Sequence, residues 1–305
     1  MRRGVHAAGI RVDADDRGCG QSRGDPLLPR ARGADPAVRE GAAAVGRGAL
    51  RRARARDGGA VRRRGGAVSG DQGGWTAYWE GLAPRHRIFE AEALDLVRRL
   101  EPVLADARPR RVLDFGCGFG FVSVGLAARV PELWAWDAAA SMRAQASARL
   151  ATCSNARVVQ AGCLDVEAMP RFDLILVNSV IQYMPPATLG EHVRLWAGLL
   201  GRGGRVLLSD LPRADASGWS ELVELLRFAR QEGFLGSAIA GGIAEARRYA
   251  RMRRERPLHA HSPEAIAGLA GAAGLRARQL PQSLTYRAGR MTVVLEHVVA
   301  NDAAA

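Results

Sequence analysis

Three glycines at alternate positions follow a short apolar run that contains one acidic residue. The run Val112–Phe115 reads as a buried strand, and its Asp114 stands two residues before the first of the glycines, which are Gly116, Gly118 and Gly120. Glycine at a strand end allows a sharp turn and lets a ligand lie against the backbone, because no β-carbon stands in the way. The pattern predicts a nucleotide-binding turn between a strand and a helix.

A second acidic residue stands at the distance expected for the end of the next parallel strand. Asp137 closes the apolar run Leu133–Trp136 and lies 17 residues after Gly120, which leaves room for one helix and a turn. A carboxylate there can accept both hydroxyl protons of a ribose. The alternative is a cap for the helix that begins near Ser141. Together with the glycine turn, the spacing favours ribose binding.

The spacing of the glycines differs from the dinucleotide fingerprint G-x-G-x-x-G, because Phe121 stands where its last glycine would be. The pattern Asp-x-Gly-x-Gly-x-Gly resembles motif I of the class I S-adenosylmethionine-dependent methyltransferases. Two later segments are similar to further motifs of that family: the strand run Phe172–Met184, and the glycine turn in Leu199–Asp210, where Arg202 replaces a proline. The resemblance covers about residues 75–300.

The resemblance implies S-adenosyl-L-methionine as cofactor. By this resemblance, the glycine backbone would pack beside the methionine and ribose of the cofactor. Asp114 would orient the ammonium group, and Asp137 would hold the ribose hydroxyls. Asp165 would bind the adenine amine, with Leu164 against the ring, although a helix cap is an equal alternative for Asp165. The full set implied to bind the cofactor is Asp114, Gly116, Cys117, Gly118, Gly120, Asp137, Leu164, Asp165 and Asn178.

Strand and helix patterns alternate from a helix at about 87–104 through Leu211. With the resemblance, this alternation predicts an α/β fold: a doubly wound, mostly parallel, seven-stranded sheet with helices on both faces. The closing strand, Met291–Val299, is expected to be antiparallel to the rest. Ligands of such sheets bind beyond the carboxyl ends of the strands. Polar residues gather at the predicted strand ends, namely Asp114, Asp137, Asp165, Asn178 and Asp210.

Residues 213–257 interrupt this alternation. The helices expected at Trp219–Phe228 and Ala244–Arg254 predict a helical lid insertion over the ligand edge, with an ordinary long crossover as the alternative. The second helix carries an arginine cluster that favours either an anionic substrate or a solvated face. Ser262 and Pro263 then begin the last helix, which we expect to end at Gly274.

Charge divides the chain into two parts. The net charge is +13, but residues 1–70 hold 16 arginines and 7 acidic residues, whereas the remainder holds 28 arginines and 24 acidic residues. Residues 1–70 contain no Phe, Trp or Tyr, so we predict a disordered Arg/Ala/Gly-rich tail followed by a methyltransferase domain at 71–305. A basic arm for an anionic partner and a natural start near Val68 are the alternatives.

Methyl transfer needs alignment of the acceptor atom more than it needs acid–base chemistry, because the implied cofactor arrives activated. Tyr183 follows the fourth predicted strand and is expected to position the substrate. His259 and His261 are candidate bases, with a helix cap or surface role as the alternative. No Cys-x-x-Cys pair or acidic cluster indicates a metal.

The sequence therefore predicts an enzyme that methylates an O, N or C atom of a small metabolite by direct displacement. Two alternatives stay open: an RNA methyltransferase that uses the basic tail and lid arginines, and a catalytically silent methyltransferase-like binding protein. A nicotinamide oxidoreductase is disfavoured by the glycine spacing. We expect a cytoplasmic protein without nucleic-acid or membrane partners, because no apolar run approaches about 18 residues; the sequence does not indicate an oligomeric state.

Overall fold

The structure is a computed structural model, and it describes residues 75–80, 87–160, 162–213, 218–236 and 258–298. The predicted tail at 1–70 and the second lid helix at 244–254, with its arginines, lie outside the described residues. Both therefore stay predictions.

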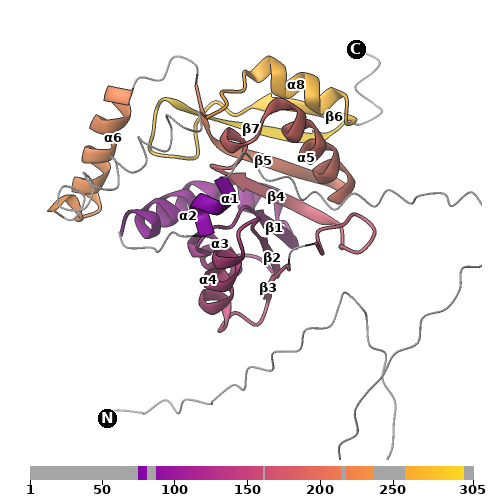
Figure 1. Cartoon of the computed structure of the whole chain (residues 1–305), viewed down its shortest axis with the longest axis horizontal. Coiled ribbons are helices and arrows are strands. Elements are labelled where there is room, and N and C mark those ends of the chain that lie inside the picture. Colours follow the sequence, from indigo (N-terminus) through magenta and orange to yellow (C-terminus); the bar gives the residue numbers. More distant parts are fainter. Residues whose placement is uncertain (1–74, 81–86, 161, 214–217, 237–257, 299–305) are drawn as a thin grey trace, which may run out of the picture. The chain divides into compact units, whose positions relative to one another are not determined.

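A seven-stranded sheet is the centre of the described unit, in the order β3-β2-β1-β4-β5-β7-β6 (Figure 1). All neighbours are parallel except β7, which is antiparallel to both β5 and β6. The strands are β1 (Arg111–Phe115), β2 (Glu132–Trp136), β3 (Ala156–Val158), β4 (Phe172–Asn178), β5 (Leu200–Pro212), β6 (Leu275–Gln279) and β7 (Arg290–His297). The chain runs outward from β1 to β3 and returns to β4 beside β1, so a topological switch point lies between β1 and β4.

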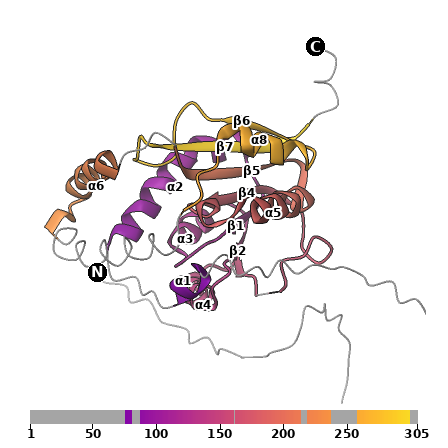
Figure 2. The ribbon, with the colours of Figure 1, turned by 45° about the horizontal axis from the view of Figure 1, so that its top comes forward.

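Helices cover both faces of the sheet (Figure 2). On one face, the buried Trp196 of α5 packs against Phe115, and α8 lies beside α5. On the other face, Leu100 of α2 and Leu126 of α3 are fully buried. Successive strand residues point to opposite faces, and both faces are covered, so strands such as β4 are apolar almost throughout. The helices are α1 (Trp75–Glu80), α2 (Ile88–Ala107), α3 (Phe121–Ala127), α4 (Ala140–Leu150), the 3₁₀ turn η1 (Ile181–Tyr183), α5 (Pro186–Leu199), α6 (Gly218–Gln231) and α8 (Pro263–Gly271).

The predicted fold class is confirmed, including the mostly parallel sheet and the antiparallel closing strand. Ser262 caps α8 as expected, since its Oγ accepts the amide of Ala265 at 3.2 Å. None of the described helices is long and apolar enough to cross a bilayer.

Two boundaries differ from the sequence expectation. The residues expected to form a turn before the fifth strand belong to β5 itself, where Leu200 pairs with Phe172 across a register shift. Gly204 lies so close to the Phe172 carbonyl that an added β-carbon would be 2.6 Å from the oxygen, so the chain turns within the ladder. Helix α8 ends at Gly271, before Gly274, because the left-handed residue Gly274 (φ 73°) belongs to the turn into β6.

Candidate functional site

The glycine turn joins the ends of β1 and β2. The amides of Gly116 and Cys117 both donate to the Trp136 carbonyl, at 2.7 and 3.0 Å. A β-carbon at Gly116 or Gly120 would collide with Val180 or with the backbone of Ala146, at 2.4 and 2.7 Å. These two glycines are therefore required by packing.

Gly118 differs from its neighbours. Its φ of 52° is left-handed, and a β-carbon there would meet no described atom within 4 Å. The turn thus exposes a bare stretch of backbone at the carboxyl end of β1, beside the switch point where open α/β sheets bind ligands. Of the three glycines, Gly118 is the one whose surroundings leave space for a ligand.

Asp137 follows β2 directly and faces this turn. Its Oδ2 accepts the Gly118 amide and its Oδ1 the Ala139 amide, both at 2.9 Å. Burial raises the pKa of the Asp137 carboxyl, and the two amides and Arg143 oppose that rise. Glu80 of α1 also caps the start of α4, because it accepts the amides of Ala140 and Ser141 at 2.5 and 2.9 Å. Asp137 and Glu80 thus both contact the start of this helix, and the ribose role of Asp137 stays a prediction.

Asp114 is buried beside the turn. The Ser123 hydroxyl donates to its Oδ2 at 2.6 Å. Burial raises the pKa of the Asp114 carboxyl to about 6, the Ser123 bond opposes this, and the charge of Asp137 adds to it. A cation beside Asp114 would favour the ionised form, which suits the ammonium group that the sequence resemblance places there.

Two further side chains shape the turn. Burial raises the pKa of the Cys117 thiol, so Cys117 is a neutral filler near neutral pH. Arg143 was missed by the sequence reasoning: its Nη1 donates to the carbonyls of Asp137 and Ala138, at 2.7 and 2.8 Å. It thereby holds the loop that presents Asp137. The available signal was an arginine in the first turn of the helix after the strand-end acid.

The predicted adenine contacts lie in the loop after β3. Leu164 is partly buried against the core on the α5 face. Asp165 is exposed, and its Oδ1 accepts the Glu167 amide at 3.0 Å. A local contact of this kind is what the helix-cap alternative for Asp165 predicts. No described hydrogen bond joins Asp165 to Asp137 or to the glycine turn, so its adenine role stays a prediction.

The three predicted catalytic side chains gather around η1. Tyr183 is buried in an aromatic cluster, with its ring centre 4.5 Å from Trp75 and 6.0 Å from Trp79. His261 is buried, its Nε2 lies 3.1 and 3.0 Å from the carbonyls of Ile181 and Met184, and burial lowers its pKa. A neutral His261 therefore braces η1. The backbone amide of His259 donates to the Gln182 carbonyl at 2.8 Å.

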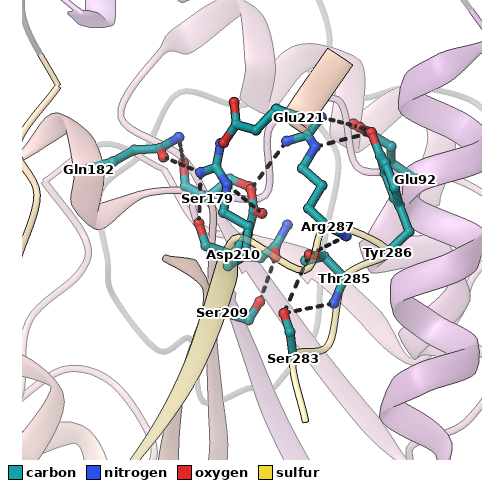
Figure 3. Close-up of polar contacts among 12 residues, drawn as sticks. Glu92, Ser179, Gln182, Ser209, Asp210, Glu221, Ser283, Thr285, Tyr286 and Arg287 are labelled. Carbon is teal, nitrogen blue, oxygen red and sulfur yellow. Dashed lines mark hydrogen bonds and ion pairs between the residues drawn. The ribbon is translucent and has the colours of Figure 1, made fainter. Parts of the chain in front are cut away.

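A second polar group occupies the ends of β4 and β5 (Figure 3). The Ser209 hydroxyl donates to Oδ1 of Asn178, and the Ser179 hydroxyl donates to Oδ2 of Asp210. Ser179 and Asp210 have φ values of 57° and 59°, in the left-handed region that costs non-glycine residues energy. Strained residues at adjacent strand ends mark candidate functional positions. Val180 packs on Gly116, so this group lies one strand along the same edge from the glycine turn.

The opposite edge of the sheet carries a surface hollow at the amino ends of the strands. Its lining is Arg110, Arg111, Pro131, Glu132, Ser154, Asn155, Arg157 and Asp173. None of the predicted site residues lines it, and the carboxyl edge is the candidate site.

The chain is similar to known methyltransferases. The family model described as a methyltransferase domain matches residues 112–204. A protein-L-isoaspartate O-methyltransferase of Chromohalobacter salexigens is 30% identical over 161 residues, which cover 47% of this chain and 70% of the relative. A trans-aconitate 2-methyltransferase of Mycobacterium sp. (strain KMS) is 35% identical over 154 residues, covering 44% of this chain and 54% of the relative. The solved N-methyltransferase NodS of Bradyrhizobium japonicum WM9, in complex with S-adenosyl-l-homocysteine, is 15% identical with a TM-score of 0.49, over 75% of this chain and 100% of that one.

The strand order and the glycine turn at its switch point define a Rossmann-like nucleotide-binding fold. With the matches above, the chain belongs to the class I S-adenosylmethionine-dependent methyltransferases. The matching segment spans 2% of the length of one curated relative and about half the length of several others.

Proposed function

We propose that this chain transfers a methyl group from S-adenosyl-L-methionine to an O, N or C atom of a small metabolite by direct displacement. The observation that carries the proposal is Gly118, whose bare left-handed backbone faces open space while its amide is held by Asp137. Family membership supports the cofactor, and the geometry supports where it binds.

The residues of the carboxyl edge fit that cofactor. The backbone at Gly118 leaves room for the bound nucleoside, and the half-buried Asp137 offers two carboxylate oxygens for ribose hydroxyls. Asp114, with its raised pKa, gains from a neighbouring ammonium group. When bound, S-adenosyl-L-methionine supplies an activated methyl group on a sulfonium. We assign Leu164, Asp165 and Asn178 supporting roles on the basis of the family resemblance.

The chain's own part in the reaction is to bind and align. Holding the two reactants in line contributes on the order of 7–11 kcal/mol to such reactions. Trp75 and Trp79 pack against Tyr183 of η1 at the same edge. Tyr183 positions the acceptor. His259 is the better placed of the two candidate bases, because His261 is occupied with two backbone carbonyls.

A small acceptor is favoured over RNA. The RNA alternative depends mainly on the arginine-rich tail, whereas residues 71–305 carry nearly balanced charge, with 28 arginines and 24 acidic residues. One relative is named for trans-aconitate and another for protein-L-isoaspartate, so neither name indicates a nucleic-acid acceptor. A catalytically silent binding protein would retain the same cofactor residues, so turnover has to be measured.

The carrying observation can be tested with two matched glycine variants. Gly118 and Gly274 both have left-handed φ values and open space beside them, but Gly274 lies in the turn before β6. Each Gly→Ala change is expected to cost about 1–2 kcal/mol of stability, because a left-handed residue with a β-carbon is strained. Calorimetry with S-adenosylhomocysteine is expected to show at least about tenfold weaker binding for G118A and none of that loss for G274A.

Turnover is tested by incubating the full chain with methyl-labelled S-adenosylmethionine and an extract of the source cells. We expect label in a small molecule, identified by mass spectrometry, and less label with G118A when the labelled cofactor is below saturation. Label that disappears on ribonuclease treatment would favour the RNA methyltransferase instead. Tight S-adenosylhomocysteine binding without any labelled product would favour the silent binding protein.

A further inference from the structure

Arg290 is an enclosed cation at the start of β7, with 8% of its side chain exposed. Its Nη2 donates to Oε1 of Glu221 at 2.7 Å, and its Nη1 makes longer bonds to Oε1 of Gln182 at 3.2 Å and the Asp210 carbonyl at 3.4 Å. Its Nε makes no hydrogen bond within the described part of the chain, and Oδ1 of Asp210 lies 3.8 Å from it. The Nε donor of this guanidinium is therefore unfilled, next to the Nη2 that donates to Glu221.

Glu221 supplies the close carboxylate from the first turn of α6. The other anchors of this helix lie towards its carboxyl end: the Phe228 ring stacks on Tyr286 at 4.0 Å, and Glu232, just past the helix, pairs with Arg98 at 2.8 Å. Leu222 and Leu226, nearer the amino end, are 43% and 38% exposed. Glu221 can therefore leave Arg290 while the far end of α6 stays attached.

Glu221 is the one carboxylate within hydrogen-bond distance of Arg290 among the described residues. Arg290 and Arg287 face Asp210, which lies 3.8 Å from each of them, while Glu92 pairs with Arg287 at 2.6 Å. Without Glu221, Arg290 has no carboxylate oxygen within hydrogen-bond distance in the described residues. An enclosed cation without a close acceptor is costly, so departure of Glu221 favours entry of another anion.

The place of this cluster suits an acceptor substrate. Figure 3 shows Gln182, Asp210 and Glu221 converging at the ends of η1, β5 and α6. Asp210 hydrogen bonds with Ser179, next to Val180, which packs on Gly116 of the cofactor turn. The anion position and the cofactor turn thus share one edge of the sheet, on either side of β4.

We propose that Arg290 anchors a carboxylate of the acceptor substrate, and that Glu221 fills this position until the substrate displaces it. The proposal rests on the methyltransferase function proposed above and names its substrate class. A carboxylate matches the two-donor edge formed by Nη2 and Nε of a guanidinium, and the resident side chain is itself a carboxylate.

The test is a titration of the full chain, saturated with S-adenosylhomocysteine, with citrate as the probe. Removing the resident carboxylate in E221Q is expected to tighten citrate binding by at least about tenfold, the equivalent of one hydrogen bond to a charged group. The matched control is E232Q, which breaks the other glutamate–arginine pair near α6 and is expected to bind citrate as the wild type does. Adding R290Q to E221Q is expected to abolish the gain.

Three outcomes would overturn the proposal: equal citrate affinity in wild type and E221Q, the same gain in E232Q, or a gain that survives R290Q. Absence of citrate binding by E221Q up to about 10 mM, or tighter binding of inorganic phosphate than of citrate, would do so as well. Should the Arg290 variants fail to fold, the comparison of E221Q with E232Q decides alone. Affinity for S-adenosylhomocysteine separates the two proposals. If the wild type does not bind S-adenosylhomocysteine, the methyltransferase function is contradicted. If it binds S-adenosylhomocysteine but the citrate test fails, only the carboxylate anchor is contradicted.

Discussion

Asp137 and Asp173 have the same kind of contact at opposite edges of the sheet. Asp137 accepts the amides of Gly118 and Ala139, and Asp173 accepts those of Arg110 and Arg111 with its Oδ2. At the residue scale, the comparison separates what a carboxylate does for the fold from what it does for a ligand. Both carboxylates accept backbone amides, but only Asp137 lies at the carboxyl edge of the sheet, where the cofactor is proposed to bind.

The first prediction concerns this pair. D137N and D173N are each expected to lower stability by about 1–3 kcal/mol, because each weakens hydrogen bonds to a carboxylate. Only D137N is expected to weaken S-adenosylhomocysteine binding, by about ten- to a hundredfold, since it removes charged acceptors for the ribose. Calorimetry on both variants checks this, and equal losses of affinity would assign Asp137 a structural role alone.

The second prediction concerns the pH dependence of Asp114. Burial raises its pKa to about 6 in the ligand-free fold, above the usual value of 3.8. The neutral form is therefore favoured by folding, and the stability that it contributes is lost as the pH rises through about 6. An ammonium ligand needs the ionised form, so affinity for S-adenosylhomocysteine should fall by about tenfold between pH 7.5 and pH 5. D114N is expected to bind more weakly at pH 7.5 and to show a smaller slope. A full wild-type slope in D114N would place the titration on another group.

At the element scale, α6 is held unevenly. Phe228 and Ala229 are buried with Phe234, while Leu226 lies exposed on the same helix. This arrangement permits movement of the amino end of α6 without detachment of the whole helix. It is the physical basis for treating α6 as the described part of the predicted lid.

The third prediction tests the attachment of α6. F228A is expected to remove about 3–5 kcal/mol of local packing, and L226A is expected to change stability by less than about 0.5 kcal/mol. Hydrogen exchange should then show faster exchange of the α6 amides in F228A, with the central strands still protected and S-adenosylhomocysteine affinity retained. Unchanged exchange in α6 would mean that Phe228 is not its anchor.

The elements were predictable because their signals are local. The apolar run of β4 and the glycine turn after β1 are contiguous in the sequence, and they fix the parallel sheet and the cofactor edge. The polar cluster was not predictable, because Arg290 meets Gln182 across 108 positions and Arg287 meets Glu92 across 195. The cap of α4 was missed for the same reason, since Glu80 reaches it from 60 residues away.

At the scale of the whole molecule, the distribution of charge bears on whether the chain acts on a small molecule or on RNA. Residues 1–70 hold 16 of the 44 arginines, while the remainder carries nearly balanced charge. If the cofactor edge and the sheet form a complete folding unit, the first 70 residues add nothing to cofactor binding. If they grip a nucleic acid, they dominate affinity for it, because phosphate contacts control such binding.

The fourth prediction is therefore the effect of deleting residues 1–70. The shortened chain is expected to unfold at the same temperature as the full chain and to bind S-adenosylhomocysteine equally well. Ligand at about 100 times Kd adds about 2.7 kcal/mol of stability, so it should raise both midpoints by about 5–11 °C. Neither chain is expected to bind RNA tightly at about 50 mM salt, where phosphate contacts are strong. RNA binding by the full chain that falls steeply with salt and disappears on deletion would instead make the arginines of residues 1–70 part of an RNA-recognition surface. A lower melting temperature or weaker ligand binding after deletion would show that these residues support the fold, contrary to the predicted domain boundary.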